Sequence, residues 1–309
     1  MPQKSEYHIN QSFRRVEHLE QLINGAKGFR LIYFFPKYCR ILLARFFQKL
    51  NKNYSTSAVT STFFSYPLKI VLPGSTDLYL FGMKSHHSEI RLTKYILRHV
   101  KPNDIVIDGG AHFGYFTLLF SYLVGDKGHV YAIEPSNFSY AVLVKNCQSI
   151  QNTSCFQLAL GHIDQSKIFH EFPAEYSEYN AESIEQYQKS DWIEAVDIKS
   201  SIVKYKRLDS FLNKRKIKPA FIKIDVEGAE WNTIKGLEPA LDYLSTKIIL
   251  EFINDGRPND LYFKTSELLI SRGFYPHSID DSGILQPISD IEGYFEKTAY
   301  DSDNFVFLL

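Results

Sequence analysis

In the segment VIDGGAHFGYF, residues 106 to 116, an apolar run ends in the acid Asp108, and a glycine-rich turn follows it. Glycine has no side chain, so such a turn between a strand and a helix lets a ligand approach the backbone closely. A second acid, Glu134, closes the next apolar run in VYAIEPS. A carboxylate at that position can accept hydrogen bonds from both hydroxyls of a ribose. Together the two features predict a nucleoside site.

The residues of the turn discriminate between nucleotide ligands. A dinucleotide fold uses G-x-G-x-x-G, but here Ala111 stands where the second glycine is required. Asp108 directly before the turn would repel a pyrophosphate and attract a positively charged ligand. The pattern D-x-G-x-x-x-G, from Asp108 through Gly110 to Gly114, therefore suits S-adenosylmethionine (SAM), which carries an amino group and a sulfonium but no phosphate. An NAD-dependent oxidoreductase is the less favoured alternative, since we find no Tyr-x-x-x-Lys pair beside a suitable Ser.

Further carboxylates follow two later apolar runs. In IDVEGAE, Asp225 ends the run and Glu227 comes two residues later, and these two are the candidate catalytic residues. Three roles stay open: Asp225 holds the cofactor's amino group, Asp225 or Glu227 is the general base, or Asp225 binds a metal with Glu251 or Asp255. We expect no metal, because no His or carboxylate cluster has ligand spacing in the sequence. Glu230 is interpreted as a favourable charge at a helix N-terminus.

Histidines and aromatic residues near the turn are secondary candidates. We favour a turn-bracing role for His112 over a catalytic one, because polar side chains in turns commonly bond locally. His86, His87 and Glu89 precede a predicted helix and can cover the mouth of the site, with one His as a less favoured base. Tyr115 is placed to stack near the cofactor or to contact a sulfonium.

An alternation of strands and helices must position these residues. Apolar runs with little alternation predict buried parallel strands, and the order of elements indicates a doubly wound α/β sheet. The expected strands are 105–108, 130–134, 155–160, 221–225 and 247–252, and the expected helices are 88–100, 115–124, 137–149, 208–214, 229–237 and 265–272. Residues 163–203 are acidic, rich in tyrosine and aperiodic, so we interpret them as an insertion or lid. The end of the chain predicts a strand pair, in GFYPHSI and NFVFLL.

Residues 1–65 are predicted to be a helical extension and linker that precedes a main domain at 66–309. The segment 29–50 is basic and aromatic, and from Pro36 onward its apolar and polar residues separate onto two helix faces. Packing on the protein core is the favoured interpretation, and contact with a membrane surface or a partner is the alternative. We expect 51–63 to be a polar linker and 68–82 to be a β-hairpin around Pro-Gly-Ser-Thr-Asp.

Composition limits the classes of function. The chain has 309 residues and 35 side chains of each charge sign, so no net positive charge points to nucleic acid. Its three cysteines, Cys39, Cys147 and Cys155, lack zinc-like spacing and favour a reducing compartment. No secretory signal is visible in the first thirty residues, and we expect a cytoplasmic location. The oligomeric state is left open.

Several motifs resemble the FkbM-type SAM-dependent methyltransferases: DIVIDGGAHFGYFTLLFS, VYAIEPS, LALG, YKRLDSFL, FIKIDVEGAEWNTIKG and IILEF. The resemblance runs from about Leu68 to the C-terminus and is strongest in Asp104–Pro135 and Phe221–Gly236. The family usually has Asn where this chain has His112.

This resemblance implies a class I methyltransferase fold, with seven strands, the last antiparallel, and helices on both faces. It also implies O-methylation of a hydroxyl on a small molecule or glycan, with SAM as the cofactor. Methylation of protein or RNA, or a non-catalytic SAM-binding scaffold, is the alternative. The residues expected to bind the cofactor are Asp108, Gly109, Gly110, Ala111, His112, Gly114, Tyr115, Glu134, Pro135, Ser136, Ala159, Leu160 and Asp225.

Overall fold

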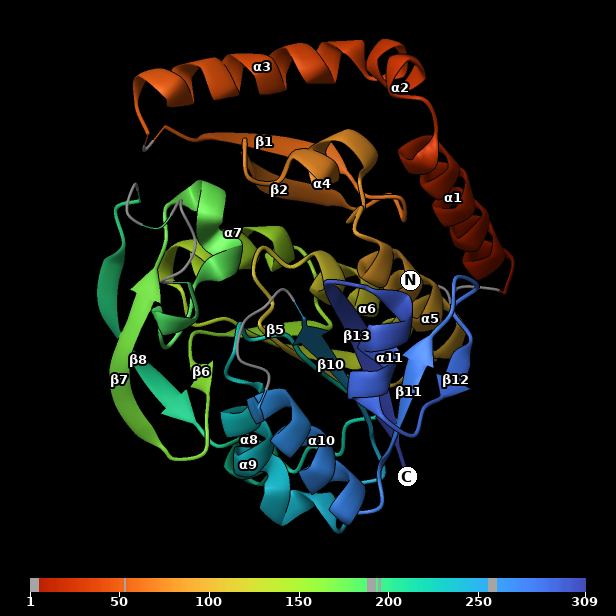
Figure 1. Cartoon of the computed structure of the whole chain (residues 1–309), viewed down its shortest axis with the longest axis vertical. Coiled ribbons are helices and arrows are strands. Elements are labelled where there is room, and N and C mark those ends of the chain that lie inside the picture. The colour runs from red at the N-terminus through yellow and green to blue at the C-terminus, as the bar shows by residue number, and fades with distance from the viewer. Residues whose placement is uncertain (1–5, 53, 188–192, 194–195, 255–259) are drawn as a thin grey trace.

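The computed structural model describes residues 6–52, 54–187, 193, 196–254 and 260–309. An eight-stranded sheet in the order β12-β11-β13-β10-β9-β3-β4-β5 forms its centre (Figure 1). Its strands are β3 (Ile105–Gly109), β4 (His129–Ile133), β5 (Thr153–Phe156), β9 (Phe221–Ile224), β10 (Lys247–Ile253), β11 (Tyr275–Ile279), β12 (Leu285–Pro287) and β13 (Ser302–Leu308). The five strands from β5 to β10 are parallel, whereas β13 runs antiparallel to β10 and to β11. This is the predicted class I fold with β12 added at one edge.

Helices cover both faces of this sheet, as Figure 1 shows. One face is packed by α5 (His87–His99), α6 (Tyr115–Val124) and α7 (Asn137–Cys147). The other is packed by α8 (Leu208–Arg215), α9 (Glu230–Leu241), α10 (Asp260–Ser271) and α11 (Ile291–Thr298). The central strands are buried on both sides, which explains their unbroken apolar sequences.

The predicted hairpin over 68–82 and linker over 51–63 are both wrong. The polar segment contains strand β1 (Thr56–Ser61), which pairs antiparallel with β2 (Pro67–Leu72). Residues Thr76–Phe81 form a short helix, α4, that ends at Gly82 in the left-handed conformation. TSAVTS supplies the β-branched residues and alternating burial that a strand needs, and Gly82 provides the helix C-terminal turn. The predicted domain boundary after residue 65 therefore falls in the connection between two paired strands.

The single strand predicted over 155–160 is also wrong, because the chain leaves the main sheet after Phe156. Ala159–Leu160 forms β6 of a separate three-stranded sheet, with β7 (Gln165–Glu171) and β8 (Lys199–Lys206). The two longer strands, β7 and β8, pair antiparallel. The segment interpreted as an aperiodic insertion therefore has a regular strand near each of its ends. Between them lie the 3₁₀ helices η1 (Ala174–Tyr179) and η2 (Glu185–Tyr187).

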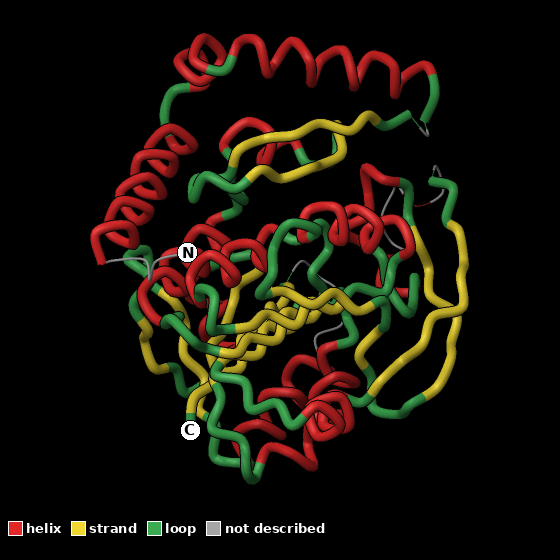
Figure 2. Tube along the Cα trace, turned by 180° about the vertical axis from the view of Figure 1, so that it is seen from behind, coloured by secondary structure: helices red, strands yellow, loops and turns green. Residues whose placement is uncertain are grey.

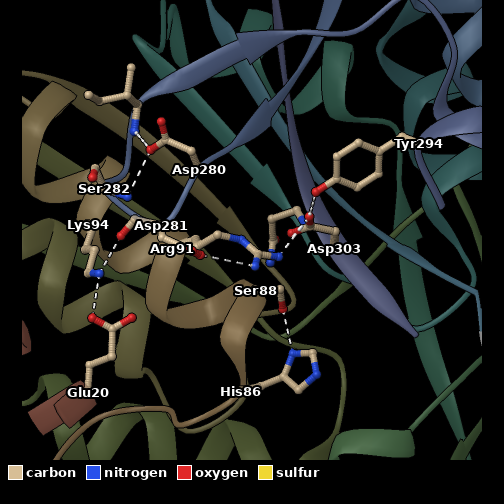
Figure 3. Close-up of polar contacts among 12 residues, drawn as sticks. Glu20, His86, Ser88, Arg91, Lys94, Asp280, Asp281, Ser282, Tyr294 and Asp303 are labelled. Carbon is tan, nitrogen blue, oxygen red and sulfur yellow. Dashed lines mark hydrogen bonds and ion pairs between the residues drawn. The ribbon is translucent and has the colours of Figure 1, made fainter. Parts of the chain in front are cut away.

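Three helices begin the described chain: α1 (Glu6–Asn24), α2 (Lys27–Tyr33) and α3 (Phe35–Leu50). Helix α1 packs beside α5, and Lys94 of α5 donates a 2.7 Å hydrogen bond to Glu20 of α1 (Figure 3). Helices α2 and α3 lie at the outer edge of the molecule, above β1 and α4 (Figures 1 and 2). No helix within the described residues is both long enough and apolar enough to span a bilayer.

Candidate functional site

The glycine turn after β3 lies at the carboxyl end of the sheet, between β4 and β9. The amides of Gly110 and Ala111 both donate to the Ile133 carbonyl at 3.0 Å, which holds the turn against β4. Gly110 has a φ of 79°, and a Cβ placed on it would lie 1.6 Å from the Asp225 carbonyl oxygen. Only glycine fits at this position, and the turn therefore presents bare backbone to the space above the sheet.

Asp108 is buried beneath this turn. Its Oδ2 accepts a 2.5 Å hydrogen bond from the Thr117 hydroxyl, and its Oδ1 has no hydrogen-bond partner among the described residues. Burial raises the pKa of Asp108, which the nearby ammonium of Lys223 opposes. A buried carboxylate oxygen without a partner is an acceptor that a ligand or water can satisfy.

Glu134 directly follows β4 and is held by two backbone amides. Its Oε2 accepts from the His112 amide at 2.8 Å, and its Oε1 accepts from the Ser136 amide at 3.0 Å. Burial raises the pKa of Glu134 to about 7, against the effect of these hydrogen bonds. The carboxylate is thus fixed in orientation, and each oxygen keeps a lone pair for a further donor.

His112 connects the glycine turn to the insertion. Its Nε2 lies 2.8 Å from the Ser177 hydroxyl of η1, and its ring stacks on Phe113 with 3.8 Å between centroids. Burial lowers the pKa of His112 to about 4, so the imidazole is neutral at neutral pH. The His112 ring thus joins the turn to the insertion, and the turn-bracing role that the sequence favoured stays a prediction.

Asp225 follows β9 and is paired with a buried lysine of the same strand. Lys223 Nζ lies 2.9 Å from Asp225 Oδ2, and the Asp225 amide donates to the Gly109 carbonyl. Burial would raise the pKa of Asp225, but the Lys223 ammonium lowers it below its usual range. On the neighbouring strand, burial and the charges of Asp225 and Glu227 raise the pKa of Glu251 well above its usual range. The two strands thus bring a carboxyl with a lowered pKa, Asp225, beside one with a raised pKa, Glu251.

The two glutamates that follow Asp225, Glu227 and Glu230, make different contacts. Glu227 sits at a φ of 50° and accepts a 3.2 Å hydrogen bond from the Tyr187 hydroxyl of η2. Glu230 is buried, and its Oε1 accepts from the amides of Val226 and Gly228, so it closes the turn at the start of α9. This geometry agrees with the structural interpretation of Glu230.

A cavity of about 340 Å³ opens where these segments meet. Its volume lies in the range typical of small-molecule sites. The predicted residues that line it are Gly110, His112, Glu134, Pro135, Ala159, Leu160, Asp225 and Glu227. The predicted residues absent from its lining are Asp108, Gly109, Ala111, Gly114, Tyr115 and Ser136.

Three of the predicted residues outside the lining make structural contacts elsewhere. Tyr115 belongs to the hydrophobic core at the start of α6, and Ser136 accepts the Ser139 amide as the cap of α7. Gly114 has a φ of 92°, and a Cβ there would lie 2.7 Å from Leu143. None of these three residues lines the cavity, and their direct contact with a cofactor stays a prediction.

The insertion, interpreted from the sequence as a lid, contributes one wall of the cavity, but sequence reasoning did not identify the residues that form this wall. Lys84 Nζ lies 3.0 Å from both Glu89 Oε1 and Glu178 Oε1, which joins the loop before α5 to η1. Burial raises the pKa of Glu89 to about 7, although Lys84 opposes the shift. Lys84 and Glu178 belong to segments without hydrophobic periodicity, so no sequence signal brought them together.

The two histidines at the start of α5, His86 and His87, face different hollows in the structure. His86 lines the cavity, where its Nε2 lies 3.3 Å from Asp301 Oδ1 and its Nδ1 lies 2.7 Å from the Ser88 hydroxyl (Figure 3). His87 faces a different hollow, beside α1. Of the pair, only His86 is therefore placed to meet a ligand in the cavity.

A metal site was expected to be absent from this region. No group of three or more His, Cys, Asp or Glu side chains within the described ranges has the arrangement to hold a metal ion. Asp255, the alternative metal partner of Asp225, lies outside the described residues.

The methyltransferase FkbM domain matches residues 108–274, more than half of the chain. The chain belongs to the FkbM methyltransferase family. Methyltransferase 1 of Beauveria bassiana (strain ARSEF 2860) is 25% identical over 203 residues, a match that covers 61% of this chain and 79% of that protein. The family confirms the resemblance seen in the sequence and with it a methyltransferase activity that uses SAM. The NAD-dependent alternative is thereby set aside.

Two solved structures are similar to this chain at a low level. Methyltransferase FkbM from Methylobacillus flagellatus KT is 13% identical with a TM-score of 0.41, and the match covers 76% of this chain and 66% of that one. Aeropyrum pernix fibrillarin, in complex with natively bound SAM, is 10% identical with a TM-score of 0.41 over 71% of this chain and 74% of that one. Both likenesses are distant, and the family assignment rests on the domain match.

Proposed function

We propose that this methyltransferase transfers a methyl group to a hydroxyl of a small polar acceptor, a small molecule or a glycan. The observation that carries the proposal is the ionised Asp225 next to Lys223 and Glu251, at the carboxyl ends of adjacent parallel strands. Open α/β sheets bind their ligands at this edge. A carboxylate held there in its ionised form can accept a hydroxyl proton.

The residues around the cavity fit SAM. The amino and sulfonium groups are positive, and the unpaired oxygen of Asp108 and the carboxylate of Asp225 give that region the opposite sign. Glu134, fixed by two amides, is oriented to accept the ribose hydroxyls. Ala159 and Leu160 line an apolar part of the cavity suited to adenine. When bound, SAM supplies an activated methyl group on its sulfonium.

The protein's own part is to orient the acceptor and to receive its proton. Asp225 stays ionised because Lys223 pairs with it, so it accepts a hydrogen bond from the acceptor hydroxyl and takes the proton as the new bond forms. Glu251, whose pKa is raised, lies beside Asp225 as a further polar group for the acceptor, and Glu227, which accepts from Tyr187, offers a second hydrogen-bond acceptor. Holding the hydroxyl in one orientation supplies much of the rate enhancement.

The composition of the lining favours an acceptor rich in hydroxyl groups. Carboxylates accept hydrogen bonds from hydroxyls, and an array of them recognises several at once. The same charges oppose a phosphate backbone, so RNA is disfavoured as the acceptor. The acidic residues of the lining are Glu89, Glu134, Glu178, Glu182, Asp225, Glu227, Glu251 and Asp301. The free thiols of Cys39, Cys147 and Cys155 favour a reducing compartment, and we propose that this compartment is the cytoplasm.

The proposal is tested by the release of S-adenosylhomocysteine from SAM in the presence of free monosaccharides and methyl glycosides. At least one of these polyols should stimulate release, and Asp225→Asn should reduce the stimulated rate by about a hundredfold or more. Glu267→Gln, which removes an exposed carboxylate on α10, is the matched control and should retain the rate. Stimulation by an RNA or a protein but by no polyol would contradict the proposal. Cofactor binding without turnover on any of these acceptors would favour the scaffold alternative.

A further inference from the structure

Helix α3 has an apolar face that the described part of the chain leaves exposed. Leu42 and Leu50 are 62% and 71% exposed, and Leu43, Phe46 and Phe47 lie exposed beside them. The face continues through the end of α2, where Ile32 is 77% exposed with Phe29, Leu31 and Tyr33 around it. Surface helices of globular proteins normally turn polar residues outward, so this orientation is the reverse of the expected one. The favoured sequence interpretation, in which this face packs on the core, is wrong.

The opposite side of α3 faces the protein. Ile41 and Ala44 are buried there against the core. Lys37 donates to the carbonyls of Tyr79 and Leu80 in α4 at 2.7 and 2.9 Å, and Arg40 donates to the Ser57 carbonyl of β1 at 3.0 Å. These contacts fix the rotation of the helix and direct its apolar face outward.

The charges around this face have one sign. Residues 21–76 contain eight Lys and Arg and no Asp or Glu, although the whole chain has 35 of each kind. Lys49 and Arg45 lie exposed on α3, Lys27 begins α2, and Lys52 follows α3. The rest of the chain therefore carries a net negative charge, and the positive charge is concentrated around the apolar face.

We propose that α2 and α3 dock this protein on an anionic lipid bilayer, with the apolar face in the interface and the basic residues at the headgroups. An apolar helix face rich in Phe and Leu, bordered by Lys and Arg, is the pattern that binds such interfaces in the plane of the membrane. With 16 residues, α3 lies along the bilayer rather than across it.

Charge favours lipid over a second copy of the chain. Two copies placed face to face would bring the same basic residues together, and like charges in contact oppose association. An anionic bilayer supplies both an apolar interior for Leu42 and Ile32 and negative headgroups for Lys49 and its neighbours. Figure 1 shows α2 and α3 along one edge of the molecule, where both can meet a flat surface together.

The test is sedimentation of the full chain with vesicles of phosphatidylcholine plus phosphatidylglycerol, against vesicles of phosphatidylcholine alone. The chain should bind the mixed vesicles, bind the neutral ones more weakly, and dissociate in high salt. Leu42→Glu and Ile32→Glu should each weaken binding by about tenfold or more, because each removes an apolar side chain and adds a repelled charge. Lys49→Gln should weaken it by about fivefold, with no change in apolar surface.

The matched control is Ile202→Glu, an equally exposed isoleucine, 79% against 77%, on β8 of the insertion. It should bind vesicles like the unmodified chain. Thermal unfolding and S-adenosylhomocysteine binding should match among all these variants, because the substituted side chains are exposed and lie away from the cavity. Absence of binding to mixed vesicles would overturn the proposal, as would equal loss in Ile202→Glu. A dimer in sedimentation velocity that Leu42→Glu dissociates, without vesicle binding, would assign the face to a second copy instead.

Discussion

Gly110 is the residue whose replacement tests the glycine turn most directly. A Cβ there would lie 1.6 Å from the Asp225 carbonyl, and the φ of 79° disfavours any other residue. We expect Gly110→Ala to lower the free energy of unfolding by about 3 kcal/mol or more and to abolish binding of S-adenosylhomocysteine. Gly273→Ala is the matched control, since Gly273 has a φ of 84° but only an ordinary contact at 3.8 Å. It should cost about 1 to 2 kcal/mol and leave binding intact. Similar losses in denaturant titrations of both variants would show that backbone conformation alone governs the turn.

Glu134 makes the affinity for the cofactor depend on pH. Burial raises the pKa of its carboxyl to about 7, so the group is ionised above that pH and protonated below it. A protonated carboxyl is a poorer acceptor for two ribose hydroxyls. Calorimetric titration with S-adenosylhomocysteine should therefore show affinity falling between about pH 8 and about pH 6. Glu134→Gln should bind about tenfold or more weakly, and its affinity should not vary across this range. The same pH dependence in the variant would place the titrating group elsewhere.

At the scale of elements, the ion pair between Arg91 of α5 and Asp303 of β13 joins a helix to the antiparallel strand. The two groups are buried at 2.9 Å, and the Tyr294 hydroxyl of α11 also donates to Asp303 (Figure 3). Arg91→Met would leave a buried carboxylate without its cation, so we expect a loss of about 3 to 5 kcal/mol in the free energy of unfolding. Arg272→Met, which removes an arginine from a more exposed pair with Asp242, should change it little. Equal midpoints in chemical denaturation of these two variants would contradict this assignment.

The elements that sequence predicted well are those whose pattern reflects burial. Tyr115–Val124 forms α6 as predicted, because an apolar run after a glycine turn has few alternatives. By contrast, Thr76–Phe81 is as apolar as a strand, and only its tertiary setting makes it a helix. Asp225 and Glu134 were found because strand ends are visible in sequence. Lys84, Glu178 and Asp301 reach the same cavity from segments without periodicity, which only the folded chain brings together.

The sequence also could not predict how a helix is rotated about its own axis. The separation of apolar and basic residues in 29–50 was visible in the sequence, but the direction of each face was not. Hydrophobicity alone favours the apolar face inward. In the structure Lys37 and Arg40 donate to backbone carbonyls of α4 and β1, so the side of the helix that carries these two residues faces those elements. Hydrogen bonds to carbonyls of other elements are tertiary information, which a single sequence does not carry.

For the whole molecule, the N-terminal helices contribute to stability without forming the cavity. Val16 and Leu22 of α1 are buried in the core, and Ser12 lies 3.2 Å from the Tyr122 hydroxyl of α6. Deleting residues 1–50 should therefore lower the free energy of unfolding by several kcal/mol, at about 1.5 to 3 kcal/mol for each large apolar side chain uncovered. No residue of Glu6–Leu50, the described part of this segment, lines the cavity, so saturating S-adenosylhomocysteine should raise the melting temperature of the truncated chain as it does that of the full chain. Calorimetric scans of both chains with and without this ligand measure the two effects separately. An unchanged melting temperature after deletion would show that these helices do not support the core, and loss of the ligand-induced rise would show that the site depends on them.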